Sequence, residues 1–238
     1  MTAFGADKDG YPEDFESRLR AAVSCAFDGW RELYESFSPV DVQTGQRRPR
    51  TPPPARDSRR AAVLLPVLPR PEGPHLVYTL RRSHLADHAG QISFPGGGAE
   101  PWDASLLETA LREAREEVGV QTGQVEVLGE MEEMYIPPSD YLVAPFVGLL
   151  STEVELSLEP DEVEEVFTVP FRELMSAESF QRVIWKREGR DYEVPVFAVE
   201  GLAAAEGEGY SRRYEIWGAT AAITAGLLCR IGWSPEPR

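Results

Sequence analysis

The sequence predicts an α/β fold, in which a central helix packs against a mixed β-sheet. Short apolar runs bounded by Pro and Gly alternate with one long helical segment, and another helical segment stands near each end of the chain. The chain has 238 residues, 42% of them hydrophobic, which is enough for one sizeable core. We therefore expect an α/β/α sandwich built on a single mixed sheet.

The N-terminal region predicts a helix followed by a linker. Apolar residues recur at helical spacing between residues 12 and 37, so this stretch is expected to form one helix. Residues 38–60 are rich in Pro and Arg and have no period, which is typical of a linker. We expect residues 1–58 to form an appendage and 59–238 the main domain. The arginines here are either solvated or a basic rim near an anionic substrate: Arg47, Arg48, Arg50, Arg56, Arg59 and Arg60.

Strands are expected on both sides of the central helix. Three apolar runs precede the helix, at residues 61–68, 75–82 and 90–97. The helix itself is predicted over 103–118, and four further runs follow at 124–132, 141–150, 166–170 and 192–200. A last helix is predicted over 217–230. The sequence contains no internal repeat.

The charge balance limits the partners of the protein. The formal net charge is −16 and the sequence pI is about 4.7, which opposes binding to nucleic acid. An acidic protein acting on an anionic substrate would need bound cations to reverse the local field. We therefore expect a small-molecule partner, with no nucleic acid and no membrane.

The remaining composition suggests a cytoplasmic protein. No stretch approaches the roughly 20 apolar residues of a membrane span, and the first residues lack the pattern of a secretory signal. Cys25 and Cys229 lie in helix-like apolar surroundings and are interpreted as reduced core thiols. The N-terminal helix either covers the sheet or mediates a homodimer.

The central helix carries an acidic strip beside an apolar face. Asp103 or Ser105 can cap the helix, and Gly119 can end it. At ~100° per residue, Glu113, Glu116 and Glu117 share an arc of about 100°. The adjacent arc is apolar and is expected to face the core: Leu107, Ala110, Leu111, Ala114 and Val118.

Clustered carboxylates point to a divalent cation. Like charges at these spacings destabilise a helix, and Mg²⁺ or Mn²⁺ removes the penalty because both prefer carboxylate oxygens. Such a cation can neutralise a diphosphate and lower the pKa of a bound water. The glycine run Gly96–Gly98 lies upstream and is interpreted as a loop with positive φ, in which a carbonyl reaches the same cation. The alternative is an ordinary amphipathic surface helix, which would not require the glycine run.

These residues resemble the motif of the Nudix hydrolase family. The run Arg112-Glu113-Ala114-x-Glu116-Glu117-x-Gly119-Val120 matches the second half of that motif at every position. The first half departs, because Ala104 stands at the position of the first Glu and Asp103 precedes it. A longer run is similar to the coenzyme A diphosphatase-like branch, with Ala86 where that branch usually has Arg: Arg81, Arg82, His88, Gly90, Gln91, Phe94, Pro95, Gly96 and Gly97. The stretches 159–174 and 216–221 also resemble it.

The resemblance implies a Nudix-like sandwich and hydrolysis of a P–O–P linkage by a metal-activated water. It implies Glu113, Glu117 and the Gly97 carbonyl as ligands of Mg²⁺ or Mn²⁺, with Glu116 a third ligand or the base. Glu162 or Glu165 is either the catalytic loop carboxylate or part of a solvated acidic turn. Arg112 is expected to pair with an acidic side chain and hold the loop, and the other motif positions are expected to be structural: Gly96, Gly98, Asp103 and Gly119.

The resemblance also suggests a substrate. Arg81, Arg82, His88 and Gln91 are expected to contact it, although a strand end or an ordered loop also accounts for them. Trp217 is interpreted as a core residue. Coenzyme A or an acyl ester is favoured, and the alternatives are ADP-ribose, dinucleotides or nucleoside triphosphates. A regulatory module that lost the chemistry is the alternative from another class.

Overall fold

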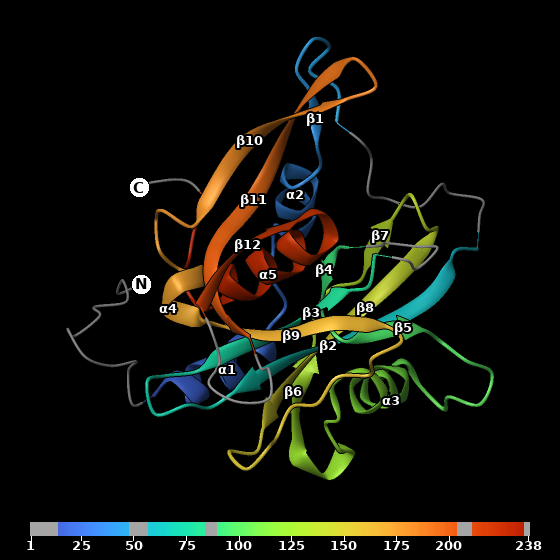
Figure 1. Ribbon diagram of the computed structural model, residues 1–238, viewed down its shortest axis with the longest axis vertical. Coiled ribbons are helices and arrows are strands. Elements are labelled where there is room, and N and C mark those ends of the chain that lie inside the picture. The colour runs from blue at the N-terminus through green and yellow to red at the C-terminus, as the bar shows by residue number, and fades with distance from the viewer. Residues whose placement is uncertain (1–13, 48–56, 84–89, 204–210, 236–238) are drawn as a thin grey trace.

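The computed structural model describes residues 14–47, 57–83, 90–203 and 211–235. Figure 1 shows the arrangement of the elements along the chain. In order they are α1 (Phe15–Val23), α2 (Trp30–Ser36), β1 (Val40–Asp41), β2 (Arg59–Leu68), β3 (His75–Arg81), β4 (Ile92–Ser93), β5 (Gly96–Gly98), α3 (Leu106–Val118), a 3₁₀ turn (Thr122–Gln124), β6 (Val125–Glu130), β7 (Met134–Ile136), β8 (Tyr141–Leu150), β9 (Val163–Pro170), α4 (Phe171–Leu174), β10 (Phe180–Arg187), β11 (Arg190–Ala203), β12 (Ser211–Trp217) and α5 (Gly218–Arg230).

The strands form one mixed sheet, as the sequence predicts. The strand order along its main path is β1-β11-β9-β3-β2-β8-β6, and β4, β5, β7, β10 and β12 pair beside this path. β2 and β8 run parallel, and the other pairs are antiparallel. β2 and β8 can pair in parallel because the crossover through α3 separates them in the sequence.

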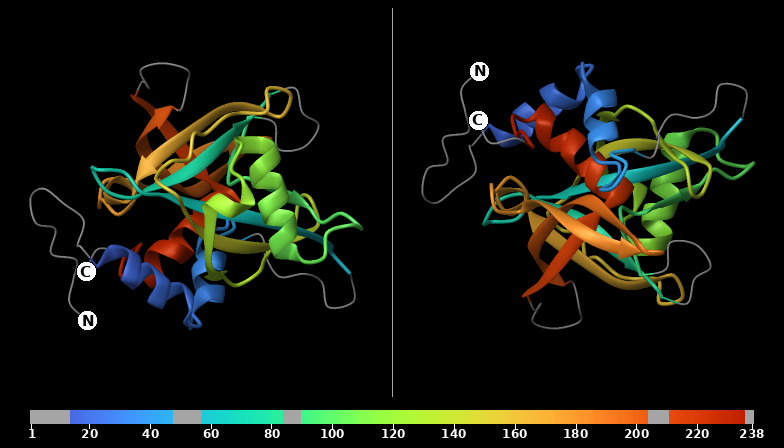
Figure 2. Two further views of the ribbon diagram at one scale, coloured as in Figure 1. Left: turned by 90° about the horizontal axis from the view of Figure 1, so that it is seen from below. Right: turned by 90° about the horizontal axis from the view of Figure 1, so that it is seen from above.

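Helices cover both faces of the sheet. On one face, Ala110, Ala114 and Val118 of α3 pack against apolar residues of β2, β3, β8 and β9. On the other face, α1, α2 and α5 share a second, larger cluster with the same strands. Figure 2 shows α3 on the side opposite to α1, α2 and α5. The α/β/α architecture is therefore confirmed, and among the helices in the described ranges α3 is the one that covers its face.

The N-terminal segment differs from the prediction of one helix over 12–37. α1 ends at Val23 and α2 begins at Trp30, because Gly29 at the start of α2 adopts a φ of 93° that breaks the helical path. Cys25 lies in this break and is exposed, so its interpretation as a core thiol is wrong. Leu19 and Tyr34 are buried in the cluster that also contains α5. The described part of the segment 1–58 therefore shares its core with the rest of the fold.

Several elements were not predicted from the sequence. The run 90–97 forms two short strands, β4 and β5, separated at Phe94-Pro95. β10 and β12 were missed, since most side chains of β10 are exposed and its sequence lacks a clear apolar face. Among the helices that the structure describes, none is long and apolar enough to cross a membrane.

His75 makes the stability of the fold sensitive to pH. Its side chain is 1% exposed at the start of β3, and Nδ1 lies 3.1 Å from the Thr168 hydroxyl. Burial lowers the pKa of His75 to about 4, against a weaker opposing effect of Glu72. The unfolded chain therefore takes up a proton below about pH 6.5 that the folded chain does not, and stability falls from there towards pH 4.

We expect this single group to remove about 2 kcal/mol of unfolding free energy between pH 7 and pH 5. Urea unfolding of wild type and His75→Gln at both pH values measures it, since Gln keeps a partner for Thr168 and does not titrate. The pH-dependent loss should be smaller in the variant by about that amount. Equal losses in the two proteins would show that His75 is protonated in the folded state.

Candidate active site

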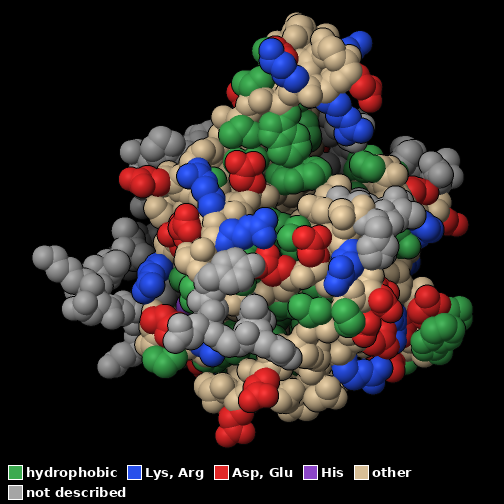
Figure 3. All heavy atoms as spheres, viewed as in Figure 1, with side chains coloured by type: hydrophobic (Ala, Val, Ile, Leu, Met, Phe, Trp, Pro, Cys, Tyr) green, Lys and Arg blue, Asp and Glu red, His purple; other side chains and the backbone are tan. Residues whose placement is uncertain are grey.

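An acidic cleft opens where α3 meets the turn before β9. Its volume is about 290 Å³, and five glutamates line it: Glu113, Glu116, Glu117, Glu159 and Glu162. Figure 3 shows acidic side chains gathered over the part of this face where Figure 1 draws α3 and the neighbouring loops. The three carboxylates that helix geometry places on one strip of α3 thus face two more from a separate segment.

The local sequence fixes both ends of α3. The Ser105 hydroxyl accepts a hydrogen bond from the Glu108 N–H at 3.2 Å, so Ser105 is the N-cap. Gly119 ends the helix with a φ of 75°, and a Cβ there would lie 2.2 Å from the Ser157 hydroxyl. Between these ends, Ala110, Ala114 and Val118 bury the apolar side and place the glutamates at its margin.

Glu117 is the most deeply buried carboxylate of the cleft. It is 2% exposed, and its Oε2 accepts the Gly96 N–H at 3.1 Å while Oε1 accepts Arg81 Nη1 at 3.0 Å. Burial raises the pKa of Glu117 to about 7, although Arg81 and the Gly96 N–H both favour the charged form. The bonds from Arg81 and the Gly96 N–H therefore offset only part of the cost of burying a negative charge on Glu117.

Arg112 holds the other two carboxylates of the strip. Its Nη1 donates to Glu113 Oε1 at 2.8 Å and to Glu116 Oε2 at 3.1 Å. Glu113 is half-buried, and burial raises its pKa against the opposing effect of Arg112. Glu116 is exposed and also accepts from Arg115 at 3.2 Å.

Asp103 fixes the position of Arg112. Its two oxygens accept Nε and Nη2 of Arg112, each at 3.0 Å, and Oδ2 also accepts the Thr109 hydroxyl at 2.8 Å. Hydrogen bonding by Arg112 lowers the pKa of Asp103 well below its usual range. Arg112 Nη2 also donates to the Gly98 carbonyl at 3.2 Å. Asp103 thus anchors Arg112 and does not cap the helix.

The glycine run is a strand and not a loop with positive φ. Gly96, Gly97 and Gly98 of β5 pair with Val63, Ala62 and Ala61 of β2. Flanking bonds from Leu64 to Pro95 and from Ala99 to Arg60 place Gly97 in a hydrogen-bonded pair with Ala62, so its carbonyl points into the ladder. The backbone groups that face α3 are instead the Gly96 N–H and the Gly98 carbonyl.

Gly96 and Gly97 are required by space, whereas Gly98 is not. A Cβ on Gly97 would lie 2.5 Å from Glu113 Oε1, whereas a Cβ on Gly96 would lie 2.4 Å from the backbone oxygen of Ala62. A Cβ on Gly98 would meet the side chain of Tyr141, with the hydroxyl nearest at 3.1 Å. The backbone of β5 therefore lies so close to the Glu113 side chain of α3 that no side chain fits between them at Gly97.

The turn before β9 supplies the two remaining carboxylates. The Glu159 N–H donates to the Glu117 carbonyl at 3.1 Å, and the Arg82 N–H donates to the Glu162 carbonyl at 3.0 Å. These bonds tie the turn to the end of α3 and to the end of β3. Glu162 was a candidate from the sequence. Glu159 was missed, and only its place in the acidic run EPDEVEE could have suggested it.

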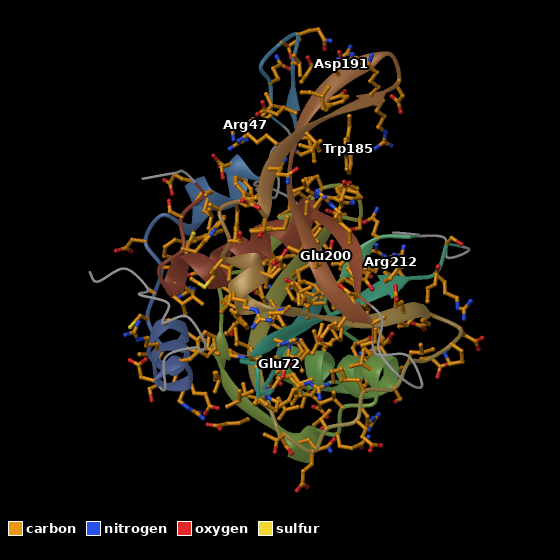
Figure 4. All side chains as sticks on the ribbon, turned by 60° about the vertical axis from the view of Figure 1, so that its left-hand side comes forward. Arg47, Glu72, Trp185, Asp191, Glu200 and Arg212 are labelled. Carbon is orange, nitrogen blue, oxygen red and sulfur yellow. The ribbon has the colours of Figure 1, made fainter. Side chains whose placement is uncertain are left out.

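Glu165 lies apart from the cleft. It is buried on β9, where Leu80 of β3 is its register partner, and Arg212 of β12 donates to it at 3.2 Å. Figure 4 shows Arg212 beside Glu200 of the neighbouring strand. Because Phe167, two residues further along, packs in the cluster with α5, Glu165 shares the sheet face opposite to α3.

Arg81, Arg82 and Gln91, three of the residues expected to contact substrate, lie at or beside the end of β3. Arg81 reaches Glu117, and its backbone N–H donates to the Gln91 carbonyl at 3.0 Å. Arg82 is partly buried beside the turn that carries Glu162. His88 lies outside the described residues. Trp217 is partly buried and packs edge-on against Trp185, with ring centroids 4.9 Å apart.

Comparison with known proteins assigns the family. Residues 58–188 match the model of the NUDIX domain. The protein named uncharacterized Nudix hydrolase NudL of Photorhabdus laumondii is 39% identical over 183 residues, which cover 76% of this chain and 90% of that protein. The protein of the same name from Yersinia pestis is 40% identical over 177 residues, covering 73% and 80% of the two chains.

The chain belongs to the Nudix hydrolase family. A crystal structure of a Nudix hydrolase from Alicyclobacillus acidocaldarius has a TM-score of 0.43 and 18% identity, over 50% of this chain and 81% of that one. Nudix hydrolases act on small-molecule nucleotide substrates and generally use divalent cations such as Mg²⁺ or Mn²⁺.

The cleft of this Nudix hydrolase has the donor chemistry that such a cation needs. Within the ranges that the structure describes, no three acidic or histidine side chains already converge as a metal site. Arg81 and Arg112 occupy carboxylate oxygens of Glu117 and Glu113 instead. The donors are all hard oxygens, and burial disfavours the charge on both carboxylates, so a divalent cation would be stabilised there. The residues present therefore fit the cation.

Gly97→Ala should impair this Nudix hydrolase without unfolding it. The new methyl group meets the Glu113 carboxylate, a movable side-chain end, so we expect displacement of Glu113 and a fall in kcat/KM of about a hundredfold. Mn²⁺ affinity and turnover, measured with the melting temperature, test this. Gly98→Ala is the matched control, because its methyl group meets only Tyr141. Equal activity of the two variants would refute the role of the missing Cβ.

Proposed function

We propose that this Nudix hydrolase cleaves the P–O–P linkage of coenzyme A or its acyl esters. The products would be 3′,5′-ADP and 4′-phosphopantetheine or its acyl form. The observation that carries the hydrolytic function is the cleft in which Glu113, Glu116 and Glu117 face Glu159 and Glu162. The preference for coenzyme A rests on the resemblance of the run from Arg81 to Gly97 to the coenzyme A diphosphatase-like branch.

Three glutamates of α3 would hold the cation. Glu117 presents a buried carboxylate to the cleft, Glu113 a half-buried one, and Glu116 lies at its exposed rim. When bound, Mg²⁺ or Mn²⁺ supplies positive charge for the diphosphate and lowers the pKa of a bound water. Asp103 keeps Arg112 fixed beside Glu113 and Glu116, which orients both carboxylates.

Glu162 is the best-placed base. It lines the cleft on the turn opposite α3, and it forms no ion pair with any basic side chain that the structure describes. Its carboxylate is thus free to accept the proton of the attacking water. Glu116 is already bonded to two arginines, and Glu165 is bonded to Arg212 outside the cleft. Arg81 and Arg82, at the end of β3, would bind phosphate oxygens.

A substrate panel with product identification tests the function. Coenzyme A, acetyl-coenzyme A, ADP-ribose, a dinucleotide polyphosphate and a nucleoside triphosphate are each incubated with Mg²⁺ or Mn²⁺, and products are identified by mass spectrometry. The proposal expects 3′,5′-ADP and 4′-phosphopantetheine at the highest kcat/KM. Fast cleavage of ADP-ribose without turnover of coenzyme A would overturn the substrate. No turnover of any compound would favour a regulatory module.

A further inference from the structure

Two arginines neutralise the carboxylates of α3, and their surroundings differ. Arg112 donates to Asp103, to the Gly98 carbonyl and to the two glutamates beside it. Its side chain is 16% exposed, and Asp103 is 3% exposed. Because Asp103 holds two of its nitrogens in a bidentate pair, Arg112 stays in place whether or not it contacts a glutamate.

Arg81 has no such anchor within the part of the chain that the structure describes. Among the residues that the structure describes, Glu117 is the one side-chain partner of its guanidinium, through a single bond of 3.0 Å. Arg81 is 22% exposed and stands on the last residue of β3, so its side chain can turn towards the cleft without moving the sheet. A guanidinium has five donors, and one bond leaves most of them available for another acceptor.

Glu117 makes the release of Arg81 conditional. Its carboxylate is held by the Gly96 N–H and is almost completely removed from solvent. Breaking the pair without replacement would leave a buried, uncompensated charge, which is strongly unfavourable. A divalent cation on the same carboxylate removes that cost. Arg81 and the cation therefore compete for the Glu117 carboxylate, and either one is enough to compensate its negative charge.

We propose that Arg81 is an exchangeable counter-ion, which holds Glu117 in the cation-free enzyme and passes to the diphosphate of the substrate once a divalent cation replaces it. This inference rests on the proposed function and adds an order of events to it. The cation binds first, and its binding creates the phosphate-binding arginine. Without the cation the enzyme therefore lacks this arginine as a contact for the diphosphate.

Arginine side-chain NMR observes the exchange directly. The Nε–H signals of ¹⁵N-labelled enzyme are followed while Mg²⁺ alone is added, and Arg81→Lys and Arg112→Lys assign the two signals. We expect the Arg81 signal to shift and broaden on Mg²⁺ binding, while the Arg112 signal stays at its place. An Arg81 signal unchanged at saturating Mg²⁺ would overturn the proposal, as would equal shifts of both signals.

Binding of Mn²⁺ alone provides a second measurement. In Arg81→Gln the cation no longer competes with a charge-assisted bond, so its affinity should rise by roughly three- to tenfold. Arg115→Gln is the matched control. Among the described residues the side-chain partner of Arg115 is the exposed Glu116, so this substitution should change the affinity less. Weaker Mn²⁺ binding in Arg81→Gln would show that Arg81 shapes the site and does not occupy it.

The two failures are distinguishable. If Mg²⁺ does not bind, or if Glu117→Gln binds it as tightly as wild type, both the cation site and the exchange are wrong. If Mg²⁺ binds through Glu117 while Arg81 keeps its bond, only the exchange is wrong. The kinetic signature of exchange is a rise in KM for the substrate in Arg81→Gln at saturating Mn²⁺, with a smaller change in kcat.

Discussion

Replacing Glu117 by Gln is expected to lower kcat by about three orders of magnitude. The amide keeps the shape of the side chain and its oxygen can still accept the Gly96 N–H. It cannot supply the negative charge that a cation requires. Since burial already disfavours the charged form of Glu117, removing the charge should change the unfolding free energy by less than about 1 kcal/mol.

Steady-state kinetics and urea unfolding of the same preparation separate the two effects. Glu108→Gln is the matched control, because Glu108 is exposed on α3 and does not line the cleft. The control should keep near wild-type turnover. Unchanged turnover in Glu117→Gln would show that the acidic strip is structural.

Replacing Arg230 by Met is expected to destabilise the fold by about 3–5 kcal/mol. Arg230 ends α5 with its side chain 3% exposed, and it donates to the carboxylate of Glu132 and to the carbonyls of Ala22 and Cys25. Glu132 in turn accepts the Phe27 N–H at 3.0 Å. Loss of the guanidinium would leave a largely buried carboxylate and two backbone carbonyls without their partner.

Urea unfolding with the double variant Arg230→Met/Glu132→Leu checks the cause. Removing both charges should recover part of the loss, because the uncompensated carboxylate is gone. If the double variant lost more unfolding free energy than the two single variants together, the packing of the two long side chains would contribute more than their ion pair. A loss below about 1 kcal/mol in Arg230→Met would mean that water replaces the guanidinium.

The acidic strip of α3 could be predicted because helical periodicity is local. The angular positions of Glu113, Glu116 and Glu117 follow from their spacing alone, and the apolar arc at Ala110 and Ala114 fixes which side faces the sheet. The structure places all three in one cleft. The mixed sheet and its two helical layers were predictable because the apolar runs of the strands and the periodicity of the helices are local patterns as well.

Features that depend on tertiary contacts could not be predicted. Whether Glu162 or Glu165 faces α3 depends on the register between β3 and β9, which shifts at Leu80 and Arg81. The spacing of apolar residues through 12–37 continues across Gly29, where the backbone turns. Gly97 is required by the Glu113 side chain and Gly96 by the β2 backbone, and no neighbouring residue in the sequence indicates either contact.

α1, α2 and α5 pack together on one face of the sheet and shield its apolar side chains from water. The stretch that matches the family, 58–188, stops in the turn between β10 and β11 and omits α1, α2 and α5. The apolar surface of Leu65, Leu76 and Phe167 would then be open to water. The family match therefore ends inside a shared hydrophobic cluster, and the sheet that carries the acidic cleft on one face is covered on the other by helices from both ends of the chain.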